Sequence, residues 1–393
     1  MAASPLHHAR FLQPRLPAFW LYVAVVAITG VVAVGEQNLF RELSPTGWAL
    51  SWLLVAVYAA PVAVLVYVLD LYEREPIPLL AAAFVWGAVA ATTLSAVGNA
   101  GWSLVIARIV GPDLATRWSA ALTAPIVEEV LKGLGVVMIV LIARDEVDDR
   151  MDGFVYGALC GLGFAVVEDV FYFLAVFGGD VGGVWKGFFV RVIASGLYSH
   201  VLYTGLVGMA VGVVAARRDA RPLGDRLRVA VPLVVAAVAG HFLWNSPILD
   251  FFPPQPWNGA EWILIPLAAA VKGLPLLAFV VLAVRLAHDR ERRWLRQALA
   301  GERDGSAVTP HEVDVLESVR RRRDARRALR DRAGARAATL LGRLQREQVN
   351  LAMIRSRVTT DDDPALVRQR ALCRSLRDAL AAIPGAAPAT PVG

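Results

Sequence analysis

Apolar residues form a series of long runs over the first three quarters of the chain. The runs cover approximately residues 18–35, 47–69, 77–106, 120–143, 153–178, 187–216, 229–249 and 261–287. A helix that crosses a bilayer needs about 20 mostly apolar residues. The pattern therefore predicts an all-α polytopic transmembrane helix bundle with about eight spans. Several runs are longer than the bilayer requires, so we expect tilted or broken helices among them.

The composition agrees with a membrane protein. The chain has 393 residues, is 56% hydrophobic and contains 11 tryptophans, with a mean hydropathy of +0.52. These values exclude an ordinary soluble domain. The first run begins near Phe19 and is not followed by a small-residue cleavage site, so we interpret it as an anchor. Two cysteines, Cys160 and Cys373, argue against disulfides and against a thiolate zinc site.

The charge of the chain is concentrated at its end. The net charge is +6, and residues from His288 onward contain 22 arginines against 14 acidic residues, so this part alone carries +8. Three regions are predicted: a cytoplasmic N-terminus (1–17), a transmembrane protease-like domain (18–287) and a cytoplasmic, basic helical tail (288–393). A basic tail beside a membrane favours anionic lipid as a partner, and because no recognition motif accompanies the charge, nucleic acid is not expected.

The orientation follows from the basic residues in the short loops. With the N-terminus inside, the inner loops contain Arg74, Arg144, Arg150 and five arginines between positions 217 and 228. The outer loops then contain Arg41, Arg108, Arg117 and Lys186. Positive charge is commoner on the cytoplasmic side. We therefore expect a multi-pass protein of the cell (inner) membrane with both termini in the cytoplasm.

Local signals divide the tail into helices. Trp294, Leu295 and Leu299 among arginines predict a helix at the membrane surface. The stretch Thr309–Glu312 is a capping box with proline at the first helical position, and Asp363–Pro364 predicts the start of a last helix. The Ala/Pro-rich end after Ile383 is expected to be disordered.

A heptad-like series in the tail gives a weak indication of self-association. Its members are Leu340, Leu344, Leu351, Ile354 and Val358.

Candidate chemistry begins with three ionisable residues inside the fourth run, Glu128, Glu129 and Lys132. Ionisable groups are costly in hydrocarbon, so such a group predicts a functional site. Glu128 and Lys132 are four residues apart and can pair along one helix face, whereas Glu129 is turned about 100° away. We therefore expect Lys132 to pair with Glu128 and leave Glu129 free for other partners.

Further polar residues lie in the next three runs, at depths that overlap with these glutamates. They are Glu168, Asp169, His200, His241 and Asn245. A carboxylate near histidines is suited to general acid or base catalysis. His241 and Asn245 are four residues apart on one helix face, where both can donate to an oxyanion.

Structural interpretations compete with the catalytic one. Glu128 with Lys132 alone is as well explained by an ion pair that neutralises buried charge. A single transmembrane histidine or asparagine is more often a contact between helices. Four consecutive spans with polar residues at matching depths nevertheless favour one polar chamber.

At these residues the chain resembles the PrsW family of intramembrane proteases, which is related to the type II CAAX prenyl endopeptidases. The resemblance extends over approximately residues 48–287. It rests on the motifs Asp70–Pro76, Glu128–Lys132, Asp152–Glu168, Ser199–Thr204 and Gly240–Asn245. The family commonly has asparagine where this chain has Asp169.

The resemblance implies an endopeptidase that cuts a membrane-anchored protein near the outer face, and in bacterial members the first cut in an anti-sigma factor. Glu128 and Glu129 would supply the base, Glu168 and His200 would complete the water or metal site, and His241 with Asn245 would stabilise the oxyanion. Lys132 and Asp169 would have supporting roles.

The residues leave the metal open. His200, His241 and Glu168 would make a His₂Glu zinc set with an open position for water. A metal-free glutamate base fits the same residues.

Two other functions fit the same residues. The first is a non-catalytic scaffold or receptor with a polar chamber, and the second is a proton-coupled transporter, because buried glutamates and histidines also form proton relays. The sequence contains no internal repeat, which transporters often have.

Overall fold

The computed structural model describes residues 11–72, 74–216, 221–248, 259–302 and 307–386. These residues are largely helical, and no β-strand occurs among them, so the predicted all-α class is confirmed. They divide into two compact units. The membrane unit comprises residues 11–70 and 74–284, and the tail unit comprises mainly residues 285–386.

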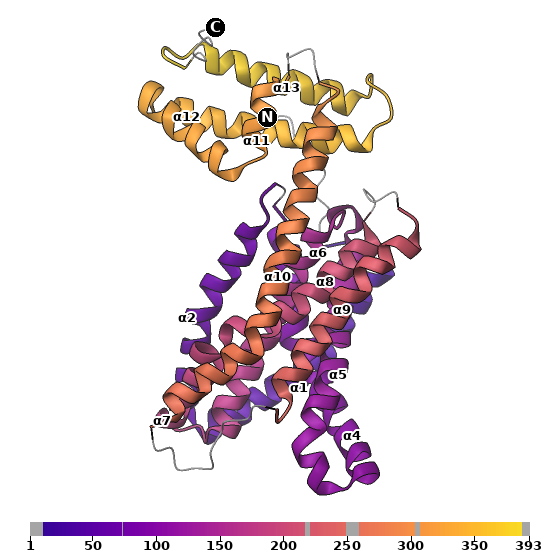
Figure 1. Ribbon diagram of the computed structural model, residues 1–393, viewed down its shortest axis with the longest axis vertical. Helices are drawn as coiled ribbons and strands as arrows, with labels where there is room; N and C mark the ends of the chain where they lie inside the picture. Colours follow the sequence, from indigo (N-terminus) through magenta and orange to yellow (C-terminus); the bar gives the residue numbers. More distant parts are fainter. Residues whose placement is uncertain (1–10, 73, 217–220, 249–258, 303–306, 387–393) are drawn as a thin grey trace. The chain divides into compact units, whose positions relative to one another are not determined.

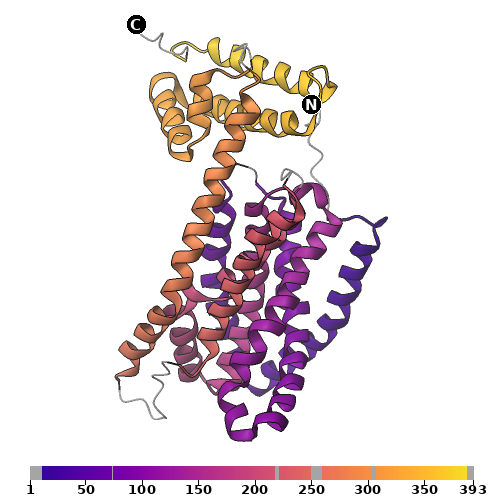
Figure 2. The same ribbon diagram turned by 45° about the vertical axis from the view of Figure 1, so that its right-hand side comes forward.

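The membrane unit is a bundle of long helices (Figures 1 and 2). Its elements are α1 (Pro17–Leu43), α2 (Pro45–Leu69), α3 (Ile77–Val85), the π-helical η1 (Trp86–Ala91), α4 (Thr92–Val110), α5 (Pro112–Ile142), the turn η2 (Arg144–Glu146), α6 (Arg150–Phe171), the π-helical η3 (Tyr172–Val176), α7 (Val181–Phe188), the π-helical η4 (Phe189–Ala194), the turn η5 (Gly196–Tyr198), α8 (His200–Ala215), α9 (Leu223–Asn245) and α10 (Glu261–Leu299).

Six of the eight predicted spans correspond to helices that are long and apolar enough to cross a membrane. The fourth run forms α5, which has 31 residues but carries three charges near its middle. The number of membrane crossings stays a prediction.

The sixth run, expected to be continuous over 187–216, is broken. A π-helical turn ends at Ala194, and α8 begins only at His200. The break contains Ser195 and Ser199, and serine favours caps and turns over helix interiors. Ser195 Oγ donates to the carbonyl oxygen of Val190. The break places His200 at the first position of α8.

Glycine permits a close helix contact between α6 and α8. A Cβ on Gly157 would lie 2.2 Å from the carbonyl oxygen of Thr204, and one on Gly153 would lie 2.2 Å from that of Gly208. Small residues allow transmembrane helices to approach in this way. The contact fixes the height of His200 and Thr204 on α8 against α6.

A tryptophan of η1 positions the middle of α5. Trp86 Nε1 donates to the carbonyl oxygen of Leu131, at 2.9 Å, and a Cβ on Gly135 would lie 2.4 Å from the indole ring. The indole therefore lies against α5 directly beside its charged residues.

The tail unit has a hydrophobic core of its own. The end of α10 packs with α11 (Pro310–Leu316), α12 (Val319–Arg357) and α13 (Pro364–Ala381). The capping box at Thr309 and the helix start at Asp363 are confirmed. Gly334, with φ of 85°, breaks α12 into two segments, and Arg326 in the first donates to Gln345 in the second.

Two expectations about the tail were wrong. Leu295 and Leu299 are 0% and 3% exposed in this core, so they do not form an apolar face for the membrane surface. Most of the heptad-like residues pack into the same core, against the end of α10, α11 and α13. They therefore do not form a seam for self-association.

Some predictions concern residues outside the described part of the chain. These are Glu73 in the motif at 70–76, Arg217 and Arg218 in the basic loop, and the predicted disorder from residue 387 onward.

The contact between α6 and α8 predicts a large effect of one methyl group. Gly157→Ala should lower the free energy of unfolding by about 1–3 kcal/mol, because the Cβ has to displace backbone. Gly101→Ala is the matched control, since no atom lies within 4 Å of that Cβ. Thermal unfolding in detergent micelles measures both. Equal melting temperatures for the two variants would contradict the packing described here.

Candidate active site

The three charged residues of α5 form one buried ion cluster. Glu128, Glu129 and Lys132 are 4%, 2% and 0% exposed. Lys132 Nζ lies 2.6 Å from Glu129 Oε1 and 3.4 Å from Glu128 Oε2. We expected Lys132 to pair with Glu128 and to leave Glu129 unpaired with it, and this expectation is therefore wrong. The lysine contacts both carboxylates, and the nearer one is three residues away along the helix.

Both oxygens of Glu129 accept hydrogen bonds from other helices. Glu129 Oε2 accepts from the Thr204 hydroxyl at 2.9 Å, and Oε1 lies 3.1 Å from His241 Nδ1. Together with Lys132 these contacts join α5, α8 and α9. Glu129 is therefore held in place by the bundle.

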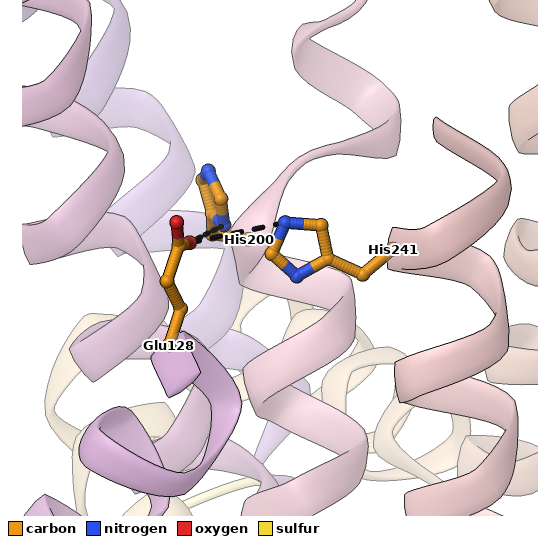
Figure 3. A group of neighbouring side chains, drawn as sticks. All are labelled: Glu128, His200 and His241. Atoms are coloured by element: carbon orange, nitrogen blue, oxygen red, sulfur yellow. Dashed lines mark ion pairs between the residues drawn. The ribbon is translucent and has the colours of Figure 1, made fainter. Parts of the chain in front are cut away.

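Glu128 has a less occupied carboxylate that faces both histidines (Figure 3). Its Oε1 accepts from Asn99 Nδ2 at 3.0 Å. Its Oε2 lies 3.9 Å from His200 Nδ1 and 3.8 Å from His241 Nε2. These separations are too long for direct hydrogen bonds and suit groups that share a water molecule or a cation.

The neighbours of the two histidines determine where their protons lie. Lys132 Nζ lies 2.9 Å from His200 Nδ1, and an ammonium can only donate, so Nδ1 accepts and Nε2–H donates to Glu168 at 2.9 Å. The carboxylate of Glu129 assigns the proton of His241 to Nδ1. His241 Nε2 is then an acceptor directed toward Glu128.

A stacked ring fixes His241 further. The Tyr203 ring lies parallel to the imidazole, with centroids 4.7 Å apart and planes 7° apart. Asn245, one turn beyond His241, is the last residue of α9 and is half-buried. The structure thus places the predicted pair on one helix end.

Glu168 and Asp169 are joined to a basic residue that the sequence analysis did not identify. Arg191 Nη2 donates to Glu168 Oε2, and its Nε donates to Asp169 Oδ1, each at 2.5 Å. The Tyr58 hydroxyl donates to Asp169 Oδ2 at 2.9 Å.

Three residues of the site were not predicted. For Arg191 the sequence did contain a signal, because an arginine inside an apolar run is unusual. Asn99 and Thr204 were also missed, because a lone polar residue in a span is commonly a contact between helices.

A small polar cavity lies next to His200. Its volume is about 30 Å³, enough for a water molecule. Its polar lining includes Tyr58, Asp169, Arg191, Ser199, His200 and Trp244. Water can therefore be held in contact with one face of the histidine.

The residues fit a divalent metal by donor type and by charge. Glu128, His200 and His241 each offer one ligand atom, and these atoms lie within 4.8 Å of one another. The set differs from the predicted one, since Glu168 contacts His200 and Arg191 instead. With ionised carboxylates and neutral imidazoles the cluster has a net charge of −2, four negative charges against two positive, from Glu128, Glu129, Glu168, Asp169, Lys132 and Arg191.

Comparison with known proteins gives two matches over this region. Residues 75–284 match a family described as PrsW family intramembrane metalloprotease. The chain is also similar to Protease PrsW of Geobacillus kaustophilus (strain HTA426), with 32% identity over 203 residues, which cover 51% of this chain and 72% of that protein. No solved structure matches the chain. The family resemblance seen in the motifs is confirmed.

The ion pairs of Arg191 predict a measurable coupling. Arg191→Gln should lower the free energy of unfolding by about 3 kcal/mol, because it leaves buried carboxylates without their charge partner. Adding Asp169→Asn should recover about 1 kcal/mol or more of this loss. Denaturant unfolding in micelles gives both values, with Arg228→Gln as an exposed control. Simple additivity of the two changes would show that the charges are not coupled.

Proposed function

The chain belongs to the PrsW family of intramembrane metalloproteases, and from this premise we propose that it hydrolyses a peptide bond of a membrane-anchored protein near the outer face of the cell membrane. The observation that carries the proposal is the position of Glu128 Oε2, which faces His200 Nδ1 and His241 Nε2 at 3.9 and 3.8 Å inside a buried chamber. These three acceptor atoms face one another at distances that suit the orientation of a nucleophilic water.

In the proposed mechanism Glu128 and Glu129 have different tasks. Glu128 Oε2 accepts the proton of the attacking water, because Oε1 is held by Asn99 and Oε2 remains directed at the two histidines. Glu129 orients His241 by accepting from Nδ1–H, as carboxylates do for catalytic histidines. Lys132 lies against both carboxylates and balances part of their negative charge.

The remaining residues stabilise the charge that develops. Glu168 fixes His200 through Nε2–H, and Arg191 and Asp169 fix Glu168 in turn. Asn245, at the end of α9, is placed to donate to the oxyanion of the tetrahedral intermediate. His241, which was expected to join it, has no free N–H for this role, because its Nδ1–H already donates to Glu129.

Zinc is the metal that we propose for the family's metal requirement, with His200 and His241 as its ligands and Glu128 beside it as the base. When bound, it would supply a Lewis acid and lower the pKa of a bound water. His200 Nδ1 would then exchange its contact with Lys132 for the metal.

The substrate and the setting are proposed from the family and from the loop charges. A single-span anti-sigma factor is the proposed substrate, cut first on the outer side. The excess of basic residues in alternate loops supports cytoplasmic termini.

The tail is proposed to bind anionic lipid. Ten arginines of α12 are exposed, at positions 320, 321, 323, 327, 330, 332, 336, 343, 346 and 357. The apolar residues near Leu295 are in the tail core, so the attraction would be electrostatic.

Cleavage of a purified substrate tests the mechanism. Glu128→Gln should reduce the cleavage rate by about 10²–10⁴, because the amide cannot accept a proton, and His241→Ala should abolish cleavage. The protein is reconstituted with a single-span anti-sigma factor, and the products are mapped by mass spectrometry. Glu36→Gln, an exposed glutamate on α1, is the matched control.

The same assay tests the metal. A chelator should stop cleavage and Zn²⁺ should restore it. Full activity of Glu128→Gln would refute the proposed base, and full activity in chelator would refute the zinc ligand set.

Lipid binding by the tail is tested in nanodiscs with the full chain. Phosphatidylglycerol should slow amide hydrogen exchange in the first part of α12 relative to phosphatidylcholine. The protection should weaken with salt, because exposed charges are screened over about 10 Å at 0.1 M. Substituting glutamine at Arg320, Arg323 and Arg327 should remove it. Equal amide hydrogen-exchange rates in the two lipids would refute the proposed binding of anionic lipid by the tail.

A further inference from the structure

An apolar groove runs along α5 and α9, with α8 at its base over part of its length. One part has a volume of about 520 Å³. It is lined by Val137 and Val140 of α5, by α8, and by the stretch of α9 from Leu227 to Val235. The other has a volume of about 380 Å³ and lies between α5 and α9 near Pro125. Val234 and Val235 line both parts, so the groove is continuous.

The length of the groove distinguishes between two candidate occupants, a lipid acyl chain and a transmembrane helix. Its lining runs from Ala121 to Val140 on α5 and from Leu227 to Phe242 on α9. At 1.5 Å per residue these stretches are about 28 and 22 Å long. The hydrocarbon core is about 30 Å thick, so an acyl chain from one leaflet reaches only about 15 Å. The groove therefore matches an object that passes through both leaflets.

The lining is suited to another helix. It consists of apolar residues, mostly valine and alanine, and several are exposed, including Ile126 at 60%, Val231 at 53% and Val235 at 58%. Small and β-branched side chains let a second helix approach closely, which is how transmembrane helices associate. No charge lies in the groove, so its occupant is expected to be uncharged over this length.

The groove passes directly beside the ion cluster. Glu128 and Glu129 lie between the two lining stretches of α5, and His241 precedes the last lining residue of α9, Phe242. The glutamates and His241 are nearly inaccessible. A bond in a groove-bound helix can therefore reach them only if α5 and α9 separate locally.

Both walls have features that permit such a separation. Trp118 of α5 stacks on Phe242 of α9, with ring centroids 6.2 Å apart, and this pair bridges the two walls. Each wall also contains an internal proline, Pro125 and Pro232, which removes a backbone hydrogen bond and allows a helix to bend.

We propose that this groove binds the transmembrane helix of the substrate, and that the α5–α9 seam is the lateral entry to Glu128 and His241. The proposal extends the proposed protease function and depends on it, because only a protease would have the bound helix as its substrate. The binding of a helix can be measured without any cleavage.

A photo-crosslinking experiment in phosphatidylcholine vesicles tests the groove. The probe is a synthetic helix of about 20 alternating leucine and alanine residues, with tryptophan at each end and a central benzoylphenylalanine. Crosslinks should map to α5 and α9. Val235→Trp fills the groove and should lower their yield about fivefold, a loss typical of one transmembrane helix contact. Val281→Trp, at an exposed position of α10, is the matched control and should leave the yield unchanged.

A second variant and a stability measurement show whether a lower yield results from misfolding. Val231→Trp should act like Val235→Trp, and melting temperatures equal to that of the unchanged protein should accompany both. Crosslinks spread evenly over all exposed helices, or unchanged yields in both folded variants, would overturn the proposal and leave the groove to lipid.

The outcomes also separate this proposal from the protease function. Cleavage of an anti-sigma factor that persists in both tryptophan variants, with scattered crosslinks, would refute the groove and leave the protease intact. Crosslinks that map to α5 and α9, in a protein that cleaves nothing, would support the groove as a helix-binding site and refute the enzyme.

Discussion

The cost of burying charge in an apolar bundle governs this structure. Four carboxylates and two basic side chains lie among helices whose other residues are mostly apolar, and an unpaired charge there would cost several kcal/mol. The bundle meets this cost by joining the charges across helices. Glu129 is held from three helices, and Arg191 holds two adjacent acids. The interactions that neutralise the charges also fix the geometry of the histidines.

Much of the bundle followed from hydrophobic pattern alone, because a membrane span is encoded in about 20 consecutive residues. The same pattern identified Glu128, His200 and His241, since ionisable residues in such runs are rare. The pattern did not determine how each helix is rotated about its axis, and therefore which side chains face each other. The choice of Lys132 for Glu129, and of Glu128 for the two histidines, depends on packing between α5, α8 and α9. Arg191 was not predicted as a site residue, because its pairing with Glu168 and Asp169 depends on how η4 packs against α6.

The tail shows a different limit of sequence reasoning. Its capping box and its last helix start were read correctly, because both are encoded within a few neighbouring residues. Its core was not, because it forms between elements far apart in the sequence, namely the end of α10, α11, the second part of α12 and α13. Leucines that suggest an outer seam along a straight helix then lie inside, together with Leu295. The repeat alone did not show which helices would cover it.

The break before α8 has a consequence for the reactants of a hydrolysis. Backbone that leaves a helix at membrane depth exposes polar groups that lipid cannot satisfy, so this side of the bundle has to be wet or covered by protein. The polar recess beside Ser199 and His200 lies there, among α2, α6, the start of α8 and the end of α9, whereas the apolar groove lies between α5 and α9 and along the later part of α8. A protease in a membrane has to bring together two partners of opposite solubility. This fold offers one approach beside His200 and another beside His241, and the two imidazole rings lie only 5.1 Å apart.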